Sequence, residues 1–143
     1  MISLQVDVEP VAVRRRLRDQ RRTRGVVGQR REHGVVGDEY VDRATASASD
    51  FAKPFQEFIT RAAWGEVWAR PGLDRRTRSA LTLALLTAGG HHEELSIHVR
   101  GAIRNGLSRE EIGEVLLHTA VYAGVPAANS AYKNAERTLA ELD

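Results

Sequence analysis

Apolar residues recur every three or four positions through most of the chain after residue 50, a spacing typical of amphipathic helices. From Phe51 to Trp68 they form one stripe, and Asp50 precedes it as a candidate N-cap. The pattern therefore predicts a helix whose aromatic side chains mostly lie in the core. The next segment, Arg75–Ala88, begins after a second candidate cap, Asp74, and is apolar nearly all round, which predicts a central, buried helix.

Three more helices are predicted towards the C-terminus, separated by short breaks. Gly106 ends the first, and the Ser-x-x-Glu capping box at Ser108–Glu111 begins the second. Gly124 ends the second, and a proline in the first turn begins the third. The helices span residues 92–105, 110–123 and 126–142, with inward-facing apolar positions at Leu95, Val99, Ala102, Ile103, Ile112, Val115, Leu116, Ala120 and Val121. Short connections between helices predict an all-α domain.

The N-terminal third of the chain is less regular. Met1–Glu9 alternates loosely between apolar and polar residues, which is typical of a short strand or an extended arm. Val11–Arg24 is rich in arginine and poor in apolar anchors, so it forms either a solvated helix or a disordered arm. Short helices are expected at Gly25–Val36, closed by Gly37, and at Asp38–Ala44.

The length of 143 residues is that of one domain, which we place at residues 25–143, after a basic arm of residues 1–24. The chain has no cysteine, which excludes disulfides, thiolate zinc sites and thiol redox chemistry. No apolar run approaches the roughly 20 residues that cross a membrane, and Asp7 and Glu9 lie near the start, where a signal peptide is positively charged. We expect a cytoplasmic protein that does not enter membranes.

Basic residues are concentrated at the N-terminus. Residues 1–37 carry nine arginines against four acidic residues, a net of +5, whereas residues 38–143 carry twelve basic residues against fifteen acidic ones, a net of −3. An interaction with nucleic acid would therefore rest on the N-terminal arm alone, and we do not expect one for the helical domain.

The stretch Gly89–His98 holds three of the chain's five histidines and two adjacent glutamates. Glu94 and His98 are four residues apart, so they share one helix face, where a carboxylate would orient the imidazole and raise its proton affinity. Such a pair suits proton transfer near neutral pH. Two alternatives remain open: the pair lies on a solvated helix face, or His91, His92, Glu94 and His98 bind a metal. Against a metal, the adjacent His91 and His92 cannot share a face, and the zinc-protease spacing His-Glu-x-x-His is absent.

Two further groups of residues suit a binding site. Trp64 and Trp68 flank Gly65 and Glu66 near a predicted helix end; core packing explains the two tryptophans as well as a site does, but it explains the residues between them less easily. Arg78 lies about one turn inside the apolar helix that follows. It either pairs with a carboxylate at the edge of the core or faces a cavity that holds an anionic ligand.

Four blocks of sequence carry a resemblance to the carboxymuconolactone decarboxylase family. They are residues 63–79, with Trp-Gly-Glu near the start; Glu93-Glu-Leu-x-x-His98; residues 105–115; and residues 121–131, with Gly-Val-Pro-Ala-Ala-Asn-Ser. The resemblance extends from about residue 25 to the C-terminus in the same order. It is specific, because the Trp-Gly-Glu and Gly-Val-Pro-Ala-Ala-Asn-Ser segments are not generic helix sequence.

This resemblance implies an all-α, alkylhydroperoxidase-like bundle of about six to seven helices. It also implies a homo-oligomer, a homotrimer or homohexamer, that needs no cofactor and no metal. Alkylhydroperoxidase-type proteins of the wider superfamily carry Cys-x-x-Cys and a later histidine, which would fall at His91, Glu94 and His98. Because this chain has no thiol, their peroxidase chemistry is excluded.

The resemblance further implies decarboxylation of 4-carboxymuconolactone to β-ketoadipate enol-lactone in protocatechuate catabolism, the β-ketoadipate pathway. Loss of CO2 from the γ carbon of this lactone dicarboxylate sends electrons through the ring to the lactone carbonyl, so the ring is its own electron sink. In this chain His98 is expected to donate the proton and Glu94 to orient it. Arg78 would bind a carboxylate or the developing oxyanion, and Glu66 and Trp64 would line the pocket.

Three other functions fit the sequence. The chain could be a non-catalytic helical oligomer that binds a small acid, a nucleic-acid-associated protein that uses residues 1–24, or a decarboxylase or isomerase of a lactone with other substituents. Assays of lactone turnover, salt-dependent DNA binding and substrate range distinguish these alternatives.

Overall fold

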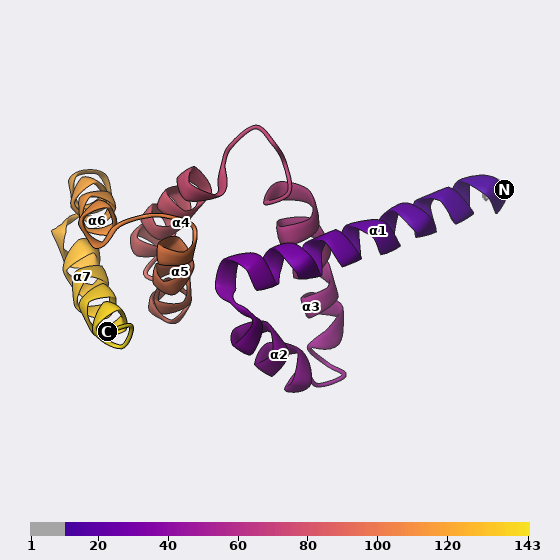
Figure 1. Cartoon of the computed structure of the whole chain (residues 1–143), viewed down its shortest axis with the longest axis horizontal. Helices are drawn as coiled ribbons and strands as arrows, with labels where there is room; N and C mark the ends of the chain where they lie inside the picture. Colours follow the sequence, from indigo (N-terminus) through magenta and orange to yellow (C-terminus); the bar gives the residue numbers. More distant parts are fainter. Residues whose placement is uncertain (1–10) are drawn as a thin grey trace, which may run out of the picture.

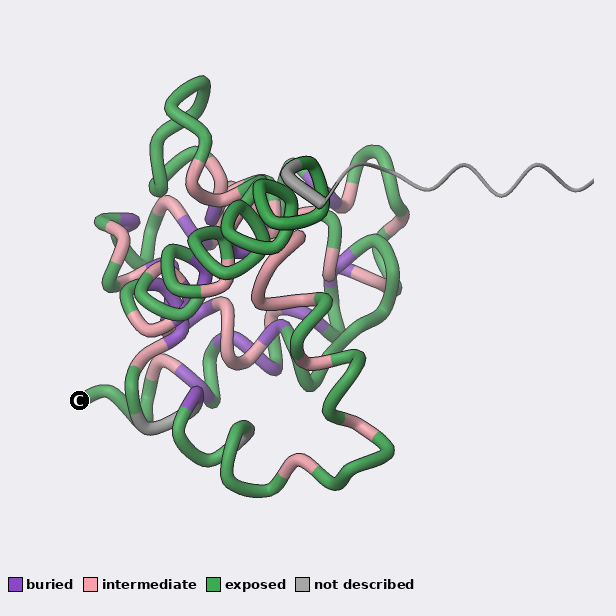
Figure 2. The backbone as a smooth tube through the Cα atoms, turned by 90° about the vertical axis from the view of Figure 1, so that its right-hand side faces the viewer, coloured by how far each residue is buried: buried purple, intermediate pink, exposed green. Residues whose placement is uncertain are grey.

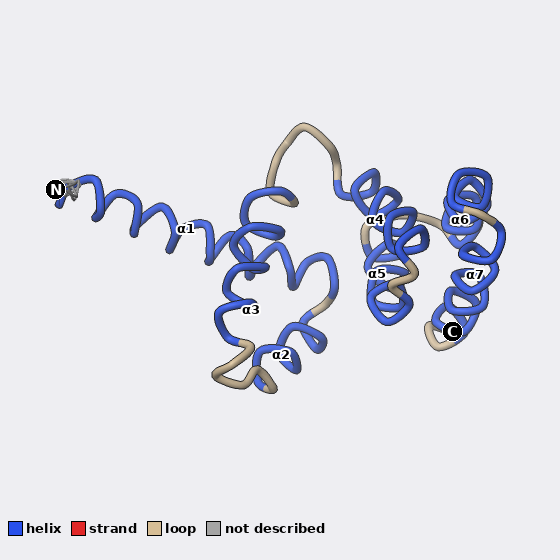
Figure 3. Tube along the Cα trace, turned by 180° about the vertical axis from the view of Figure 1, so that it is seen from behind, coloured by secondary structure: helices blue, strands red, loops and turns tan. Residues whose placement is uncertain are grey.

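The computed structural model describes residues 11–143, and every regular element within this range is helical (Figure 3). The predicted all-α fold class is confirmed, whereas the strand or extended arm predicted at Met1–Glu9 lies outside the described residues. No helix of the described range is long and apolar enough to cross a membrane. The elements are α1 (Val11–Val36), α2 (Asp38–Ala46), α3 (Lys53–Ile59), the π-helix η1 (Thr60–Val67), α4 (Arg75–Gly89), α5 (His92–Arg104), α6 (Arg109–Ala123) and α7 (Val125–Ala140).

These elements form two groups of helices, joined by the arched loop that leads into α4 (Figure 1). The N-terminal group comprises α1, α2, α3 and η1, and the C-terminal group comprises α4 to α7. The larger core belongs to the C-terminal group and contains Leu83, Leu95, Val99, Ala102, Leu107, Ile112, Leu116, Ala131 and Ala135. The smaller core belongs to the N-terminal group and contains Val35, Val36, Val41 and Trp64. Ile97 of α5 packs against this smaller core, so α5 connects the two groups.

The boundaries of the C-terminal helices follow the local signals in the sequence. Asp74 caps α4, because its carboxylate accepts a hydrogen bond of 2.7 Å from the backbone N–H of Thr77. Ser108 and Glu111 form both halves of the predicted capping box at the start of α6. Gly106 has a positive φ of 95°, a conformation that ends helices and favours glycine. The helix starts and ends predicted in this half of the chain are therefore confirmed to within a residue or two.

Helix α1 is continuous across residue 25 and is longer than the short helix predicted at Gly25–Val36. Of the two alternatives for the arginine-rich segment, residues 11–24 form the solvated helix. The side chains of residues 13–24 are almost all exposed (Figure 2), and this half of α1 projects beyond the other helices (Figure 1). α1 packs against η1, α5 and α2, and its buried residues Val35 and Val36 lie at the C-terminal end.

The single helix predicted from Phe51 to Trp68 is instead two elements, α3 and the π-helix η1. A π-helix closes its hydrogen bonds five residues apart, as when the Trp68 N–H donates to the Ala63 carbonyl at 2.9 Å. The backbones of α1 and η1 approach so closely that a methyl group on Gly28 would lie 2.0 Å from the Thr60 carbonyl oxygen. One on Gly65 would lie 2.3 Å from the Arg24 carbonyl oxygen. Glycine at both positions is what allows this contact.

Several apolar positions predicted to face the core are exposed. Phe51, Phe55 and Phe58 are 96%, 66% and 52% exposed, so the prediction that these aromatic side chains are mostly core is wrong. Leu85 of α4 and Val121 of α6 are 71% and 76% exposed, so α4 is buried on one face rather than all round. Periodicity identifies an apolar face but does not say whether the same chain covers it.

Candidate active site

His98 of α5 lies against two tryptophan rings, that of Trp64 in η1 and that of Trp68, which directly follows η1. The imidazole centroid is 6.2 Å from that of Trp64, with 16° between the ring planes, and 6.4 Å from that of Trp68, with 24°. The two indoles contact each other, with centroids 5.2 Å apart. Because α5 and η1 belong to different groups, His98 sits where the two groups meet, with an aromatic wall on one side.

Trp64, in the second half of η1, and Trp68, its C-cap residue, are four residues apart and therefore lie on nearly the same side of the helix. This spacing presents both indoles to the same histidine. Trp64 is buried in the smaller core, and Trp68 packs against that core from its edge. Isolated π-turns are frequent at functional sites, which draws attention to this element.

Burial controls the protonation of His98. It lowers the pKa of the imidazole from 6.5 to about 4, and the negative charge of Glu94 opposes this shift only in part. At neutral pH the ring is therefore unprotonated. The expected effect of Glu94, a raised proton affinity, has the right sign, but desolvation outweighs it.

Glu94 is exposed, and no hydrogen bond joins it to His98 in the described structure. It acts on the imidazole through its charge at a distance. The role of orienting the ring is more readily filled by the two indoles, because they hold it on one side by stacking.

Arg78 lies in the first turns of α4, with donors that the described residues do not satisfy. One Nη2 hydrogen bond of 3.2 Å reaches the carbonyl of Arg70, which is two residues beyond Trp68. Its Nε is buried and has no hydrogen-bond partner. No carboxylate of the described residues pairs with Arg78. Of the two alternatives, the geometry favours a guanidinium that still has a donor to offer a ligand.

Glu66 and Gly65 have structural explanations that sequence reasoning did not supply. The Glu66 side chain is about half exposed, and its carboxylate accepts a hydrogen bond of 2.7 Å from the Arg24 guanidinium of α1. Gly65 provides the close approach of η1 to α1 described above. In this arrangement Glu66 is engaged on the outer side of η1, whereas Trp64 faces His98.

Glu32 of α1 is a buried carboxylate that the sequence analysis did not single out. It is 4% exposed and accepts hydrogen bonds from Thr60 at 3.2 Å and from Gln56 at 3.4 Å. Burial raises its pKa above the usual 4.5, and these hydrogen bonds counteract part of the rise. The Trp64 indole N–H also favours the charged form, although it is buried without a hydrogen bond of normal geometry. The sequence signal was its place on one helix face with Gly28 and Val35.

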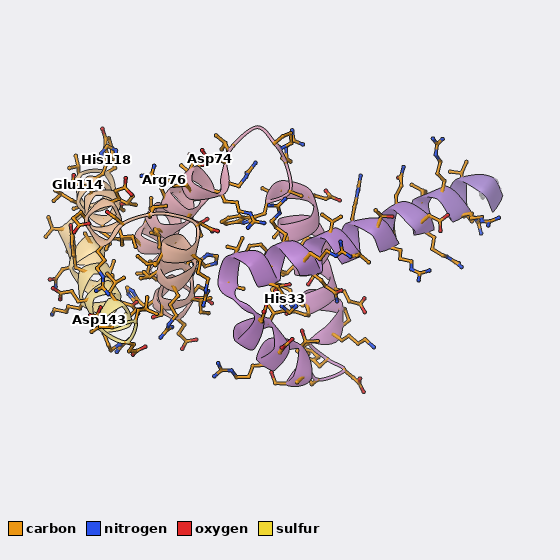
Figure 4. The ribbon with its side chains drawn as sticks, viewed as in Figure 1. His33, Asp74, Arg76, Glu114, His118 and Asp143 are labelled. Atoms are coloured by element: carbon orange, nitrogen blue, oxygen red, sulfur yellow. The ribbon has the colours of Figure 1, made fainter. Side chains whose placement is uncertain are left out.

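Two cavities open on the N-terminal group, and neither is lined by His98 or Arg78. One, of about 620 Å³, lies near His33 (Figure 4) and is lined by basic side chains of α2 and α5. The other, of about 1120 Å³, runs between α1 and α3 and includes Glu32. Within residues 11–143, no three histidine or carboxylate side chains lie close enough to hold a metal ion. The perturbed histidine and the aromatic wall therefore lie outside these two cavities.

Comparisons with known proteins identify the family of the chain. Residues 53–137 match the carboxymuconolactone decarboxylase family and contain η1, the first turns of α4 and His98. A 4-carboxymuconolactone decarboxylase of Acinetobacter baylyi is 46% identical over 108 residues, which cover 76% of this chain and 81% of that protein. A nitrosuccinic acid decarboxylase of Metarhizium robertsii is 47% identical over 108 residues, 76% of each chain. An uncharacterised 15.0 kDa protein of Paracoccus denitrificans is 34% identical over 82 residues, 56% of this chain and 61% of that protein. The chain therefore belongs to the carboxymuconolactone decarboxylase family.

Proposed function

We propose that this protein decarboxylates 4-carboxymuconolactone to β-ketoadipate enol-lactone, the step that protocatechuate catabolism requires. The observation that carries the proposal is an unprotonated histidine against an aromatic wall, in a chain nearly half identical to a 4-carboxymuconolactone decarboxylase over 108 residues. The reaction needs a place for two carboxylates, a stabilised lactone oxyanion and a proton donor.

The bond that breaks joins the γ carbon of the lactone to its carboxylate. The electron pair moves through the ring double bond to the lactone carbonyl, giving a dienolate, and the α carbon then takes up one proton. The ring itself stores the charge, so the chemistry that the protein supplies is binding, charge stabilisation and proton delivery. Decarboxylation by this route releases CO2 and consumes one proton.

His98 is the proton donor in this scheme. The free imidazole is neutral at pH 7, because burial lowers its pKa to about 4. A bound dianion would reverse this balance, since a nearby negative charge favours the imidazolium. His98 then takes up its proton only when substrate binds, and it donates this proton to the α carbon once the dienolate has formed. Glu94 contributes a smaller attraction of the same sign.

The tryptophan wall suits the carboxylate that departs. An apolar environment destabilises a carboxylate but not the neutral CO2 that it becomes, so it favours the loss of CO2. Trp64 and Trp68 form such an environment beside His98. Arg78, with its unused buried Nε, binds a carboxylate or the oxyanion of the dienolate. Glu66 supports the wall indirectly, because its ion pair with Arg24 ties η1 to α1.

A second substrate is suggested by the relative of Metarhizium robertsii. Nitrosuccinic acid also carries a carboxylate on a carbon next to an electron sink, here a nitro group, and a second carboxylate on a neighbouring CH2. Binding two carboxylates, stabilising the new anion and delivering a proton would serve both compounds, with a nitronate in place of the lactone oxyanion. Nitrosuccinate is therefore the rival substrate that the proposal must exclude.

The exposed apolar residues of α3, α4 and α6 favour a homo-oligomer, a homotrimer or homohexamer, as the working form. Such an assembly would cover side chains that the single chain leaves in water.

Turnover of both substrates tests the proposed function. The loss of lactone absorbance in the ultraviolet, with CO2 release measured in parallel, should show a kcat/KM for 4-carboxymuconolactone at least about 100-fold above that for nitrosuccinate. The opposite preference would assign the nitro compound instead. Turnover of neither would leave a helical protein that binds a small acid.

A further inference from the structure

A group of arginines with no carboxylate partner lies next to the candidate site. Arg75 and Arg78 occupy the first turn of α4, three residues apart and therefore on one face. Arg31 comes from α1, in the other group of helices. Within residues 11–143, neither Arg31 nor Arg75 makes an ion pair or hydrogen bond with a side chain.

Contacts with α1 fix the position of Arg75. Its guanidinium lies over Gly34, where an added methyl group would be 3.2 Å from Nη1 and 3.3 Å from Nη2. Gly34 is three residues from Arg31, so both guanidiniums lie at the same turn of α1. The two charges are close enough that Arg31, after burial, lowers the pKa of Arg75. Like charges held this close without an anion repel each other.

The same turn of α1 adjoins the segment that carries His98. The Val35 carbonyl oxygen would lie 2.8 Å from a methyl group on Gly101, one turn after His98 on α5. Arg78 donates a hydrogen bond to the carbonyl of Arg70, which is two residues after Trp68 in the chain. Through α1 and through Arg70, the arginines of α4 are therefore connected to the segments that carry His98 and Trp68.

We propose that Arg31 and Arg75 together bind the carboxylate that the substrate keeps, its acetate arm, across the junction of the two helix groups. This inference rests on the proposed function and divides the tasks within it. The guanidinium groups of Arg31, which is half-buried, and Arg75, which is exposed, hold the acetate carboxylate. There the carboxylate is both paired and solvated. Arg78 is then left for the lactone oxyanion, and the departing carboxylate for the tryptophan wall.

A stable probe separates the acetate arm from the reaction. It is the butenolide that carries the acetate arm and has a hydrogen in place of the departing carboxylate, so it cannot lose CO2. Its methyl ester is the matched neutral compound. The dissociation constants of both are measured by calorimetry for the wild type, Arg31→Ala and Arg75→Ala.

Each arginine variant should bind the acid about 10- to 100-fold more weakly, because a charge-assisted hydrogen bond is lost, and should bind the ester as the wild type does. Steady-state turnover of 4-carboxymuconolactone should show a rise in KM of the same size with little change in kcat. Arg76→Ala is the control. Arg76 is the neighbouring residue on α4 (Figure 4), but it pairs with Glu111 of α6, so both affinities should stay unchanged.

Two results would overturn the inference while leaving the proposed function in place: wild-type turnover with an unchanged KM in both arginine variants, or equal weakening of acid and ester. The second would mean that the arginines support packing rather than the carboxylate. A wild-type protein that neither turns over the dicarboxylate nor binds the probe would remove the proposed function, and this inference with it.

Discussion

At the scale of single residues, the account depends on a histidine that resists protonation. The aromatic wall removes water from His98 and lowers the pKa of its imidazole to about 4. In the proposed scheme, the imidazole of His98 is neutral in the free protein and becomes protonated only when the substrate anion binds. This arrangement also has a consequence for stability that can be measured without any substrate.

The stability of the protein should fall between pH 6.5 and pH 4 because of His98. In this window the unfolded chain binds a proton at His98 and the folded chain does not, so unfolding is favoured as the pH falls. The full effect is about 3 kcal/mol, from a shift of 6.5 to about 4. Urea unfolding of His98→Gln should show a shallower loss than the wild type over this range.

His118→Gln is the matched control, since His118 lies on α6, exposed to solvent and far from α1 (Figure 4). The unfolding free energy of this variant should change with pH as that of the wild type does. A His98→Gln curve parallel to the wild-type curve would contradict the burial argument.

Residue-scale prediction from sequence succeeded where chemistry is local. The Asp74 cap, the capping box at Ser108 and the positive φ of Gly106 depend on neighbours a few residues away. The His98 environment could not be predicted, because the indoles that pack against it are about thirty residues earlier in the chain. The spacing of Glu94 and His98 correctly predicted that the carboxylate raises the pKa of the imidazole. It did not predict the burial of His98, which lowers this pKa by more.

At the scale of elements, the contact between α1 and η1 sets the position of the tryptophan wall. The sequence indicated one helix from Phe51 to Trp68, and it could not show the change to a π-helix, because wide turns here accompany packing against α1. The contact with α1 also explains Gly65, which the sequence alone indicated as a possible site residue. Its function is to admit the backbone of α1.

Gly28→Ala should therefore destabilise the protein by about 1–3 kcal/mol or more, because its methyl group would overlap the Thr60 carbonyl oxygen at 2.0 Å. Gly25→Ala is the control three residues earlier on the same helix, with nothing within 4 Å of the added methyl group. It should stabilise the helix by about 0.5–1 kcal/mol. Thermal unfolding of both variants checks the prediction, and equal stability of the two would refute the close contact.

Glu32 makes a second prediction about the same contact. Burial raises its pKa, so the folded state holds its proton to a higher pH than the unfolded state does. Its contribution to stability is present below pH 4.5 and is lost as the pH rises through the folded pKa. Relative to the wild type, Glu32→Gln should therefore gain stability as the pH rises from 4.5 to 7. A difference in unfolding free energy that stays constant over this range would contradict the assignment.

At the scale of the whole molecule, one chain does not cover its own apolar surface. The exposed apolar residues Phe51, Phe55, Leu85, Val121 and Tyr122 come from separate parts of the chain. Sequence periodicity predicted the faces of Phe51, Phe55, Leu85 and Val121 but assigned them to the core of one subunit, and it made no prediction for Tyr122. Covering by further copies of the chain is the simplest way to keep such surface from water.

Val121→Arg should dissociate the oligomer, because a charged side chain would be buried without a partner at the interface. Sedimentation velocity should show a trimer or hexamer for the wild type and smaller species for the variant. Lys133→Glu, at an exposed polar position of α7, changes the charge without this cost and should keep the wild-type assembly. A monomeric wild type would contradict the proposed assembly.

The central claim is that His98 delivers the proton after CO2 leaves, and the kcat of His98→Gln on 4-carboxymuconolactone tests it most directly. Glutamine keeps much of the volume beside the indoles but cannot become a cationic acid. The account predicts a kcat about 10²- to 10⁴-fold below the wild-type value, with the same circular dichroism spectrum at pH 7. A folded variant that turns over the lactone at the wild-type rate would contradict it.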